Sequence, residues 1–167
     1  SPDKIIIKTG AIESDRLKNL RNIRRESSSV RIAFTSCGST QFNQAIDLIK
    51  QIAFSLPKSR QWEFLIRPHP LHDIDGDWER WLEATSELSS NVKLHVSSGN
   101  SEHPTAIDLI ATCDWHLSMG SSCHFEALAL QIPSIFLTNK AIKPFYNKVN
   151  ESHGSYITTS AEHCISL

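Results

Sequence analysis

Short apolar runs typical of strands alternate along this chain with stretches in which apolar residues recur every three or four positions. The strand-like runs are 30–35, 62–67, 92–96, 115–119, 134–137 and 156–159. The helical stretches are 42–56, 77–88, 105–112 and 122–130, and Ser160 opens a last helix. Connections of this length do not form hairpins, so neighbouring strands should run parallel and be joined by covering helices. The pattern predicts an α/β fold, a Rossmann-like, doubly wound, mostly parallel sheet of about six strands flanked by helices.

Composition narrows the class of protein. The chain has 167 residues, 40% of them hydrophobic, which suits one globular domain. A net charge of -1 argues against binding nucleic acid through bulk charge. No apolar run approaches the roughly 18 to 20 residues of a membrane span, and the start does not resemble a signal peptide. We therefore expect a cytoplasmic protein.

The cysteines support the same location. They are widely spaced and form no C-x-x-C pair, so we expect free thiols in a reducing compartment. The four positions are Cys37, Cys113, Cys123 and Cys164.

The beginning of the chain suggests a join to another domain. Met119 is the single methionine, and the first residues read "SPDKIIIKTG". We interpret residues 1–29 as a linker from a missing N-terminal domain and residues 30–167 as a nucleotide-binding domain. The basic run 16–26 is typical of a solvated helix face, with contact to an anionic membrane surface as the alternative.

Ligands of open α/β sheets bind at the carboxyl ends of the strands. One candidate loop there begins "MGSSCHFE", in which Gly120, Ser121 and Ser122 can present amides and hydroxyls to a phosphate. Glu126 follows one helical turn after Ser122, where a carboxylate suits the two hydroxyls of a ribose. The alternative is an ordinary Ser122 helix cap with Glu126 as a surface residue.

A second candidate loop begins "RPHP" at the end of the second strand. Two prolines hold His69 in extended backbone, which suits an imidazole that donates to an oxygen anion. The planar guanidinium of Arg67 matches the geometry of a phosphate. In the alternative interpretation, His69 satisfies a backbone carbonyl and Arg67 pairs with an aspartate in 73–75.

Carboxylates also cluster in "DIDGD" at 73–77. The rest of a calcium loop is missing, so we expect Asp77 to cap the following helix instead. No metal ion is expected.

Several of these motifs, in this order, resemble a known family. "RPHP" followed by "IDLIATCDWHLSMGSSCHFEALALQIPSIFL" resembles the C-terminal half of GT-B glycosyltransferases, especially bacterial enzymes of capsular and surface polysaccharide synthesis. It is also similar to non-hydrolysing UDP-N-acetylglucosamine 2-epimerases and CDP-glycerol glycerophosphotransferases. The resemblance covers most of residues 5–138. Trp115, His116 and His124 depart from the family pattern.

The resemblance implies roles for individual residues. The expected phosphate contacts are His69, Ser121 and Ser122, and the expected ribose contact is Glu126. Gly38 and Ser39 would face the interdomain cleft as neighbours of the phosphate or donor sugar. Residues 97–100 would approach the base.

The implied function is that of a donor nucleotide-sugar-binding half. His69 and Arg67 are the candidate catalytic residues, because they would stabilise the charge on the nucleotide phosphate leaving group. The missing N-terminal domain would supply the acceptor site and general base, so we expect little turnover from this chain alone. The resemblance implies no cofactor or metal, and its partners are a nucleotide sugar and a lipid-linked acceptor at the inner face of the membrane. The alternatives are a UDP-sugar 2-epimerase, a CDP-glycerol-type phosphotransferase and a non-catalytic nucleotide-binding module.

Overall fold

A computed structural model describes residues 14–21, 28–35, 42–69, 83, 88–97, 105–137, 154–158 and 160–167. Its strands are β1 (Ser29–Thr35), β2 (Gln61–Arg67), β3 (Val92–Val96), β4 (Trp115–Ser118), β5 (Ser134–Phe136) and β6 (Ser155–Ile157). They form one six-stranded sheet in the order β3-β2-β1-β4-β5-β6, and every neighbouring pair is parallel. The predicted Rossmann-like α/β fold is confirmed.

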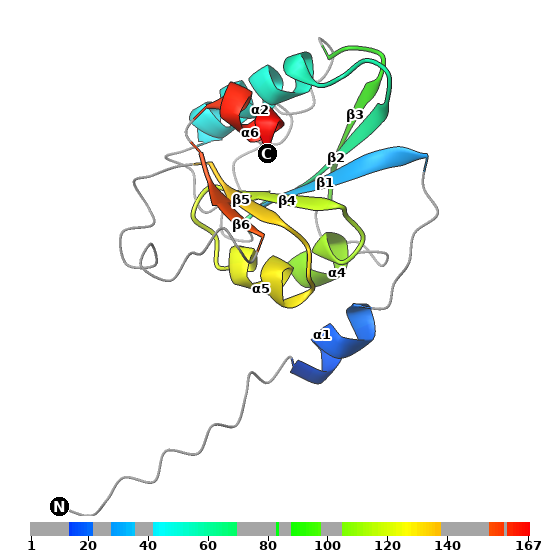
Figure 1. Ribbon diagram of the computed structural model, residues 1–167, viewed down its shortest axis with the longest axis vertical. Helices are drawn as coiled ribbons and strands as arrows, with labels where there is room; N and C mark the ends of the chain where they lie inside the picture. The colour runs from blue at the N-terminus through cyan, green and yellow to red at the C-terminus, as the bar shows by residue number, and fades with distance from the viewer. Residues whose placement is uncertain are drawn as a thin grey trace, which may run out of the picture.

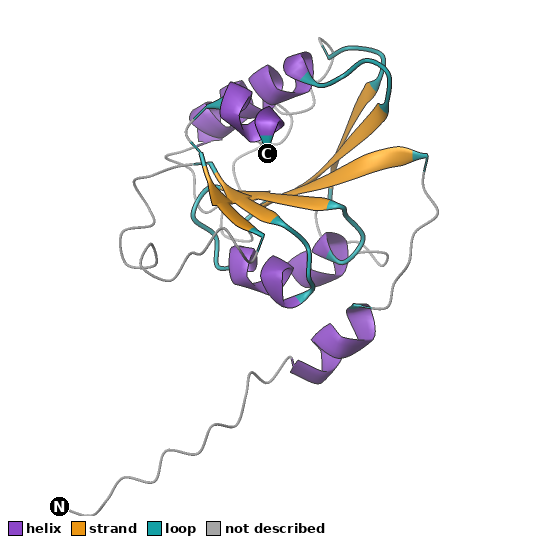
Figure 2. Cartoon of the chain, viewed as in Figure 1, coloured by secondary structure: helices purple, strands orange, loops and turns teal. Residues whose placement is uncertain are grey.

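Helices cover both faces of this sheet (Figure 1). The described helices are α1 (Ser14–Leu20), α2 (Phe42–Ser55), α4 (Ala106–Ile110), α5 (Cys123–Ala129) and α6 (Ala161–Ser166). Helices α2 and α6 lie together on one face, and α4 and α5 lie on the other (Figure 2). The helix predicted over 77–88 falls outside the described residues, apart from the helical residue Glu83.

Local sequence signals explain where two of the helices begin. Thr105 and Asp108 form a reciprocal capping box at the start of α4, as the sequence predicts for Thr105. Ser160 caps the start of α6 with a single hydrogen bond, because its hydroxyl accepts from the amide of His163.

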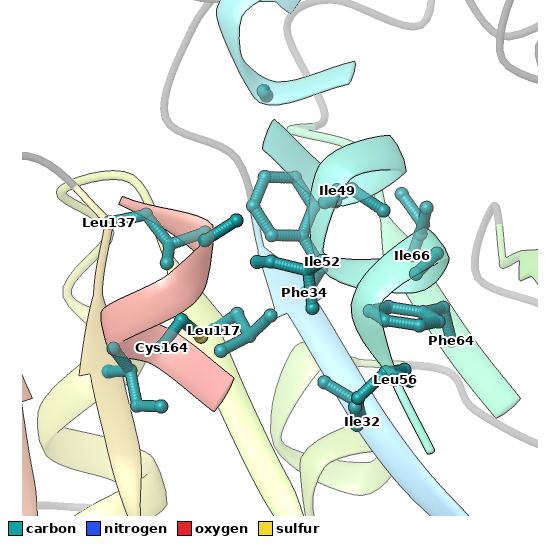
Figure 3. Close-up of a cluster of buried hydrophobic side chains, with 14 of the residues drawn as sticks. Ile32, Phe34, Ile49, Ile52, Leu56, Phe64, Ile66, Leu117, Leu137 and Cys164 are labelled. Atoms are coloured by element: carbon teal, nitrogen blue, oxygen red, sulfur yellow. The ribbon is translucent and has the colours of Figure 1, made fainter. Parts of the chain in front are cut away.

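The larger part of the core lies between the sheet and helices α2 and α6. Alternate strand residues such as Ile32 and Phe34 point to this face and meet Ile49 and Ile52 of α2. Figure 3 shows these side chains packed together with Cys164 of α6. Apolar burial of this kind supplies most of the driving force for folding.

A smaller apolar cluster lies beneath α4 and α5 and includes Leu65, Leu109 and Ala127. Helix α1, which belongs to the segment 1–29, packs Leu17 and Leu20 against this cluster. An ion pair of 2.6 Å between Arg16 and Asp108 adds a polar contact between α1 and α4. The segment predicted as a linker therefore contains a helix that contacts this domain.

The order of the strands fixes where the switch point of the sheet lies. The chain moves outward from β1 to β3, returns to place β4 beside β1, and then moves outward on the other side to β6. Helix α2, which follows β1, lies on one face, and helix α5, which follows β4, lies on the opposite face. The carboxyl ends of β1 and β4 are therefore the switch point, where doubly wound sheets bind ligands.

Candidate functional site

The candidate site lies at the carboxyl edge of the three central strands. In the register of the sheet, Thr35 of β1 pairs with Arg67 of β2 on one side and with Ser118 of β4 on the other. The ends of β2, β1 and β4 are therefore level. Because all three strands are parallel, the loops after Arg67 and after Ser118 leave the sheet at the same edge.

The loop after β4 is organised by its own hydrogen bonds. Gly120 has a φ of 91°, which an L side chain adopts only under strain, so a glycine is favoured at this turn. The amide of Ser121 donates to Oγ of Ser118 at 2.9 Å, and Oγ of Ser121 accepts from the amide of Cys123 at 3.3 Å. The polar atoms of Ser121 therefore hold the loop in shape.

Ser122 differs from its neighbour. It occupies the N-cap position of α5, but its side chain makes no capping hydrogen bond, and the residue is exposed. The hydroxyl is therefore not used in the ordinary capping role that the sequence offers as an alternative. Glu126, half-buried one turn later, contacts the thiol of Cys123.

The end of β2 carries Arg67 and His69, both half-buried. Nη1 of Arg67 donates to the carbonyl oxygen of Ser97 at 3.1 Å, which ties the ends of β2 and β3 together. Strand β1 separates β2 from β4, so the Arg67 and Ser118 backbones are roughly 10 Å apart across the sheet. The two candidate loops therefore begin at the same edge of the sheet, but the strand ends from which they start are not in contact.

Ser97 has an unusual environment. It is 7% exposed, and its Oγ has no hydrogen-bond partner within the described part of the chain. A buried hydroxyl without a partner is uncommon, and it lies beside Arg67 at the same edge. The other base-contact candidates, 98–100, lie outside the described residues, as do Gly38, Ser39 and the acidic run 73–77.

A buried chain of polar side chains lies next to the site on the face under α5. Oγ1 of Thr35 lies 2.9 Å from Nε2 of His116, and Nδ1 of that ring lies 2.6 Å from Oγ of Ser134. Oγ of Ser134 also lies 2.8 Å from Nδ1 of His124, whose Nε2 lies 2.7 Å from Oγ of Ser155. We call these five residues the buried polar chain. It joins β1, β4, β5, β6 and α5.

Both imidazoles of this chain are neutral at pH 7. Burial, reinforced by the neighbouring His124, lowers the pKa of His116 to about 3. Burial lowers the pKa of His124 to about 4. The ring of His124 also stacks on Phe136, with 3.7 Å between ring centroids. A neutral imidazole has one donating and one accepting nitrogen, so each ring can join two hydroxyls.

The described cysteines are free, as predicted, and Cys37 lies outside the described residues. Burial raises the pKa of Cys113 to about 12 and that of Cys164 to about 11. Burial also raises the pKa of Cys123, with hydrogen bonds to Ser121 and Thr35 acting in the opposite direction. None of these thiols has the lowered pKa of an activated nucleophile.

The described residues contain no group of three or more His, Cys, Asp or Glu side chains that could hold a metal ion. No helix among them has the length and apolar character needed to cross a membrane.

An apolar cavity of about 150 Å³ lies between the sheet, α2 and α6. Trp62 and Trp115 line it, and they stand at the amino-terminal ends of β2 and β4. The cavity is therefore remote from the carboxyl edge, and its lining does not suit an anion.

Sequence reasoning missed the polar residues that end the two central strands, Thr35 and Ser118. The signal was present, because "VRIAFT" and "WHLS" are both apolar runs that finish in a hydroxyl side chain at the switch point. No corresponding sequence signal marks Ser134 and Ser155, which meet the histidines only through tertiary packing.

No protein-family model matches the sequence, and no curated protein matches it. Solved structures do resemble it. A glycosyltransferase from Rickettsia africae has a TM-score of 0.62 and 14% sequence identity, over 99% of this chain and 46% of that one. The UDP-GlcNAc 2-epimerase of Neisseria meningitidis, bound to UDP-GlcNAc, has a TM-score of 0.58 and 16% identity, over 93% of this chain and 40% of that one.

The wall teichoic acid polymerase TagF is a third similar structure, with a TM-score of 0.54, 14% identity, and coverage of 93% of this chain and 38% of that one. The chain thus spans less than half the length of each of these proteins. It shares the fold of one part of GT-B-like glycosyltransferases and UDP-GlcNAc 2-epimerases.

Proposed function

We propose that this chain is the donor-nucleotide-binding half of a GT-B glycosyltransferase that acts in surface polysaccharide synthesis. The main support is that the "RPHP" and "MGSS" loops leave the sheet at the same carboxyl edge, beside the switch point of a 3-2-1-4-5-6 sheet. The similar epimerase structure that contains UDP-GlcNAc adds support for a nucleotide sugar as the ligand.

In this proposal the loop after β4 holds the phosphates. The exposed hydroxyl of Ser122 is the side-chain donor, because Ser121 uses its own polar atoms inside the loop. Gly120 lets the backbone approach the ligand without a side chain between them. The carboxylate of Glu126 accepts hydrogen bonds from the ribose hydroxyls.

Arg67 and His69 then act on the leaving group. When the bond to the sugar breaks, negative charge grows on the nucleotide phosphate, and fixed donors stabilise this charge more in the transition state than in the ground state. This role needs no metal ion. The acceptor, which we propose is lipid-linked, and the general base belong to an N-terminal domain that closes over the cleft at the cytoplasmic side of the membrane. Gly38 and Ser39 would line that cleft.

Isothermal titration with UDP, CMP and CDP tests the binding role. Replacing both His69 and Ser122 with Ala removes two donors, so we expect the nucleotide Kd to rise about 10- to 100-fold. A matched control replaces His163 and Ser166 with Ala, since these residues of the same types are exposed on α6. The control should bind within about twofold of the wild type. Equal affinity of the double variant and the wild type would refute the assignment.

A UDP-sugar 2-epimerase is the second candidate, favoured by the likeness to the N. meningitidis enzyme. An epimerase needs no acceptor, so product analysis of the full-length protein with UDP-GlcNAc alone separates it from a transferase. The likeness to TagF keeps a CDP-glycerol-type phosphotransferase open, and tighter binding of CDP than of UDP would favour it. Nucleotide binding without turnover by the full-length protein would instead indicate a non-catalytic module.

A further inference from the structure

The buried polar chain fills the space between α5 and the sheet with side chains that all need hydrogen-bond partners. All five side chains are at most 3% exposed, so each polar atom without a partner would be costly. Apolar side chains of similar size would need no partners there. A fully satisfied polar network, in contrast, has very few arrangements and therefore fixes the relative positions of the elements that it joins.

The chain ends at Thr35, at the carboxyl edge of β1. Burial raises the pKa of the Cys123 thiol, the nearby Glu126 carboxylate raises it further and the nearby Thr35 hydroxyl lowers it, so these three side chains lie close together. Cys123 and His124 are consecutive residues in the first turn of α5. The path therefore leaves this turn through His124, crosses β5 and β4, and ends at Thr35 of β1, close to Cys123 of the same turn.

A neutral imidazole has one donating and one accepting nitrogen, so the direction of the hydrogen bonds at one end fixes the direction of the whole chain. The interior end of the chain sets this direction. Ser155 is 1% exposed, and within the described residues its hydroxyl has no side-chain partner except Nε2 of His124. Its proton must point at that nitrogen to avoid being buried without an acceptor. Nδ1–H of His124 then donates to Ser134, and the Ser134 hydroxyl donates to Nδ1 of His116.

We propose that His116 and His124 are positioning residues for the candidate nucleotide site, within a one-directional hydrogen-bond chain whose protons all point from Ser155 toward Thr35, so that Nε2–H of His116 donates to Oγ1 of Thr35. The chain holds the first turn of α5 through His124 and fixes that turn relative to the carboxyl end of β1. The effect on ligand binding rests on the proposed nucleotide function, whereas the direction of the hydrogen bonds is independent of that function.

The tautomers of the two histidines test the direction. Imidazole ¹⁵N spectra of the full chain at pH 7 should show His116 protonated at Nε2 and His124 protonated at Nδ1, with neither ring charged. The opposite pair of tautomers, or a charged ring, would overturn the proposal. A histidine that merely filled space would show no such fixed pair.

Variants at Thr35 test the positioning role. Thr35→Val is nearly isosteric but removes the hydroxyl that accepts from Nε2 of His116, whereas Thr35→Ser keeps the hydroxyl. Thr158→Val is the matched control, because Thr158 is equally buried at 3%, directly follows β6 and lies outside the chain.

Amide hydrogen exchange in the first turn of α5 should be about tenfold faster in Thr35→Val than in the wild type, and close to wild type in Thr35→Ser and Thr158→Val. The Kd for UDP should rise about tenfold only in Thr35→Val. Equal exchange in Thr35→Val and Thr35→Ser would overturn the positioning role. If the wild type fails to bind UDP, the nucleotide function is wrong, while the exchange and tautomer results still decide this proposal.

A second pair of variants covers the case in which Thr35→Val does not fold. Ser155→Ala removes the hydroxyl at which the chain begins, and Ser155→Thr keeps it. The same exchange measurement should separate these two variants in the same direction, and identical rates would count against the proposal.

Discussion

The two faces of the sheet are buried to a similar depth but are filled by different chemistry. Beneath α2 and α6, the fully buried residues are apolar, with Phe34 as an example. Beneath α5, His116 and Ser134 are equally buried but are joined by hydrogen bonds. Apolar packing is non-directional and tolerates small shifts, whereas a hydrogen-bonded chain does not. The face whose buried side chains need specific hydrogen-bond partners is also the face covered by α5, the helix that begins at the candidate site.

Acid should distinguish the two faces most strongly. His116 and His124 have folded-state pKa values of about 3 and about 4, below the ordinary value of 6.5. Between the folded-state and the ordinary pKa of each histidine, the unfolded chain therefore binds more protons than the folded chain. Their contribution to stability is complete above pH 6.5 and is lost as the pH falls toward 4. Each histidine contributes a slope of up to about 1.4 kcal/mol per pH unit in this window. Urea unfolding at pH 7.5, 6.5, 5.5 and 4.5 measures this slope.

Glu63 and Asp108 do not account for loss of stability in that window. Burial raises the pKa values of Glu63 and Asp108, but hydrogen bonds, from Arg31 and Arg16 among others, hold both below the usual range. These groups add acid sensitivity only below about pH 4.5. A His116→Gln variant should show about half of the wild-type slope. A free energy of unfolding that stays constant from pH 7.5 to 4.5 would show that the imidazoles are not buried as described.

Truncation on the apolar face should have the next largest effect. Phe34→Ala removes a fully buried ring in the centre of the sheet, so the free energy of unfolding should fall by about 3–5 kcal/mol. Phe54→Ala is the control, because Phe54 is 56% exposed on α2. It should lose less than about 1 kcal/mol in the same denaturation experiment. Similar losses from both variants would contradict the position of the core.

Two neighbouring residues of β5 give the finest comparison, since Ser134 lies in the polar chain and Ile135 packs in the apolar core. Ser134→Ala leaves two imidazole nitrogens without partners and should cost about 1–3 kcal/mol. Ile135→Val removes one methylene and should cost about 0.5–1.5 kcal/mol. Chemical denaturation at pH 7.5 compares them. A smaller cost for Ser134→Ala than for Ile135→Val would show that the polar chain is dispensable.

The apolar pattern was sufficient to predict the strands, the helices that cover them and the parallel sheet. Thr105 and Ser160 were readable as helix starts because a cap acts within a few residues of the chain. The role of Ser122 was harder to predict, because this residue stands at the N-cap position of α5 but its hydroxyl makes no capping hydrogen bond. His116 and His124 stood out as departures from a family pattern, but their serine partners lie on other strands, and no local pattern encodes such contacts.

We propose that a nucleotide binds at the carboxyl ends of β1, β2 and β4. The most direct test of this binding is an NMR titration of the full chain with UDP, with backbone amide and imidazole shifts followed together. We predict that the largest changes occur at Gly120–Cys123 and at His69. The absence of any change, or changes centred on Trp62 and Trp115 at the opposite end of the sheet, would contradict the account.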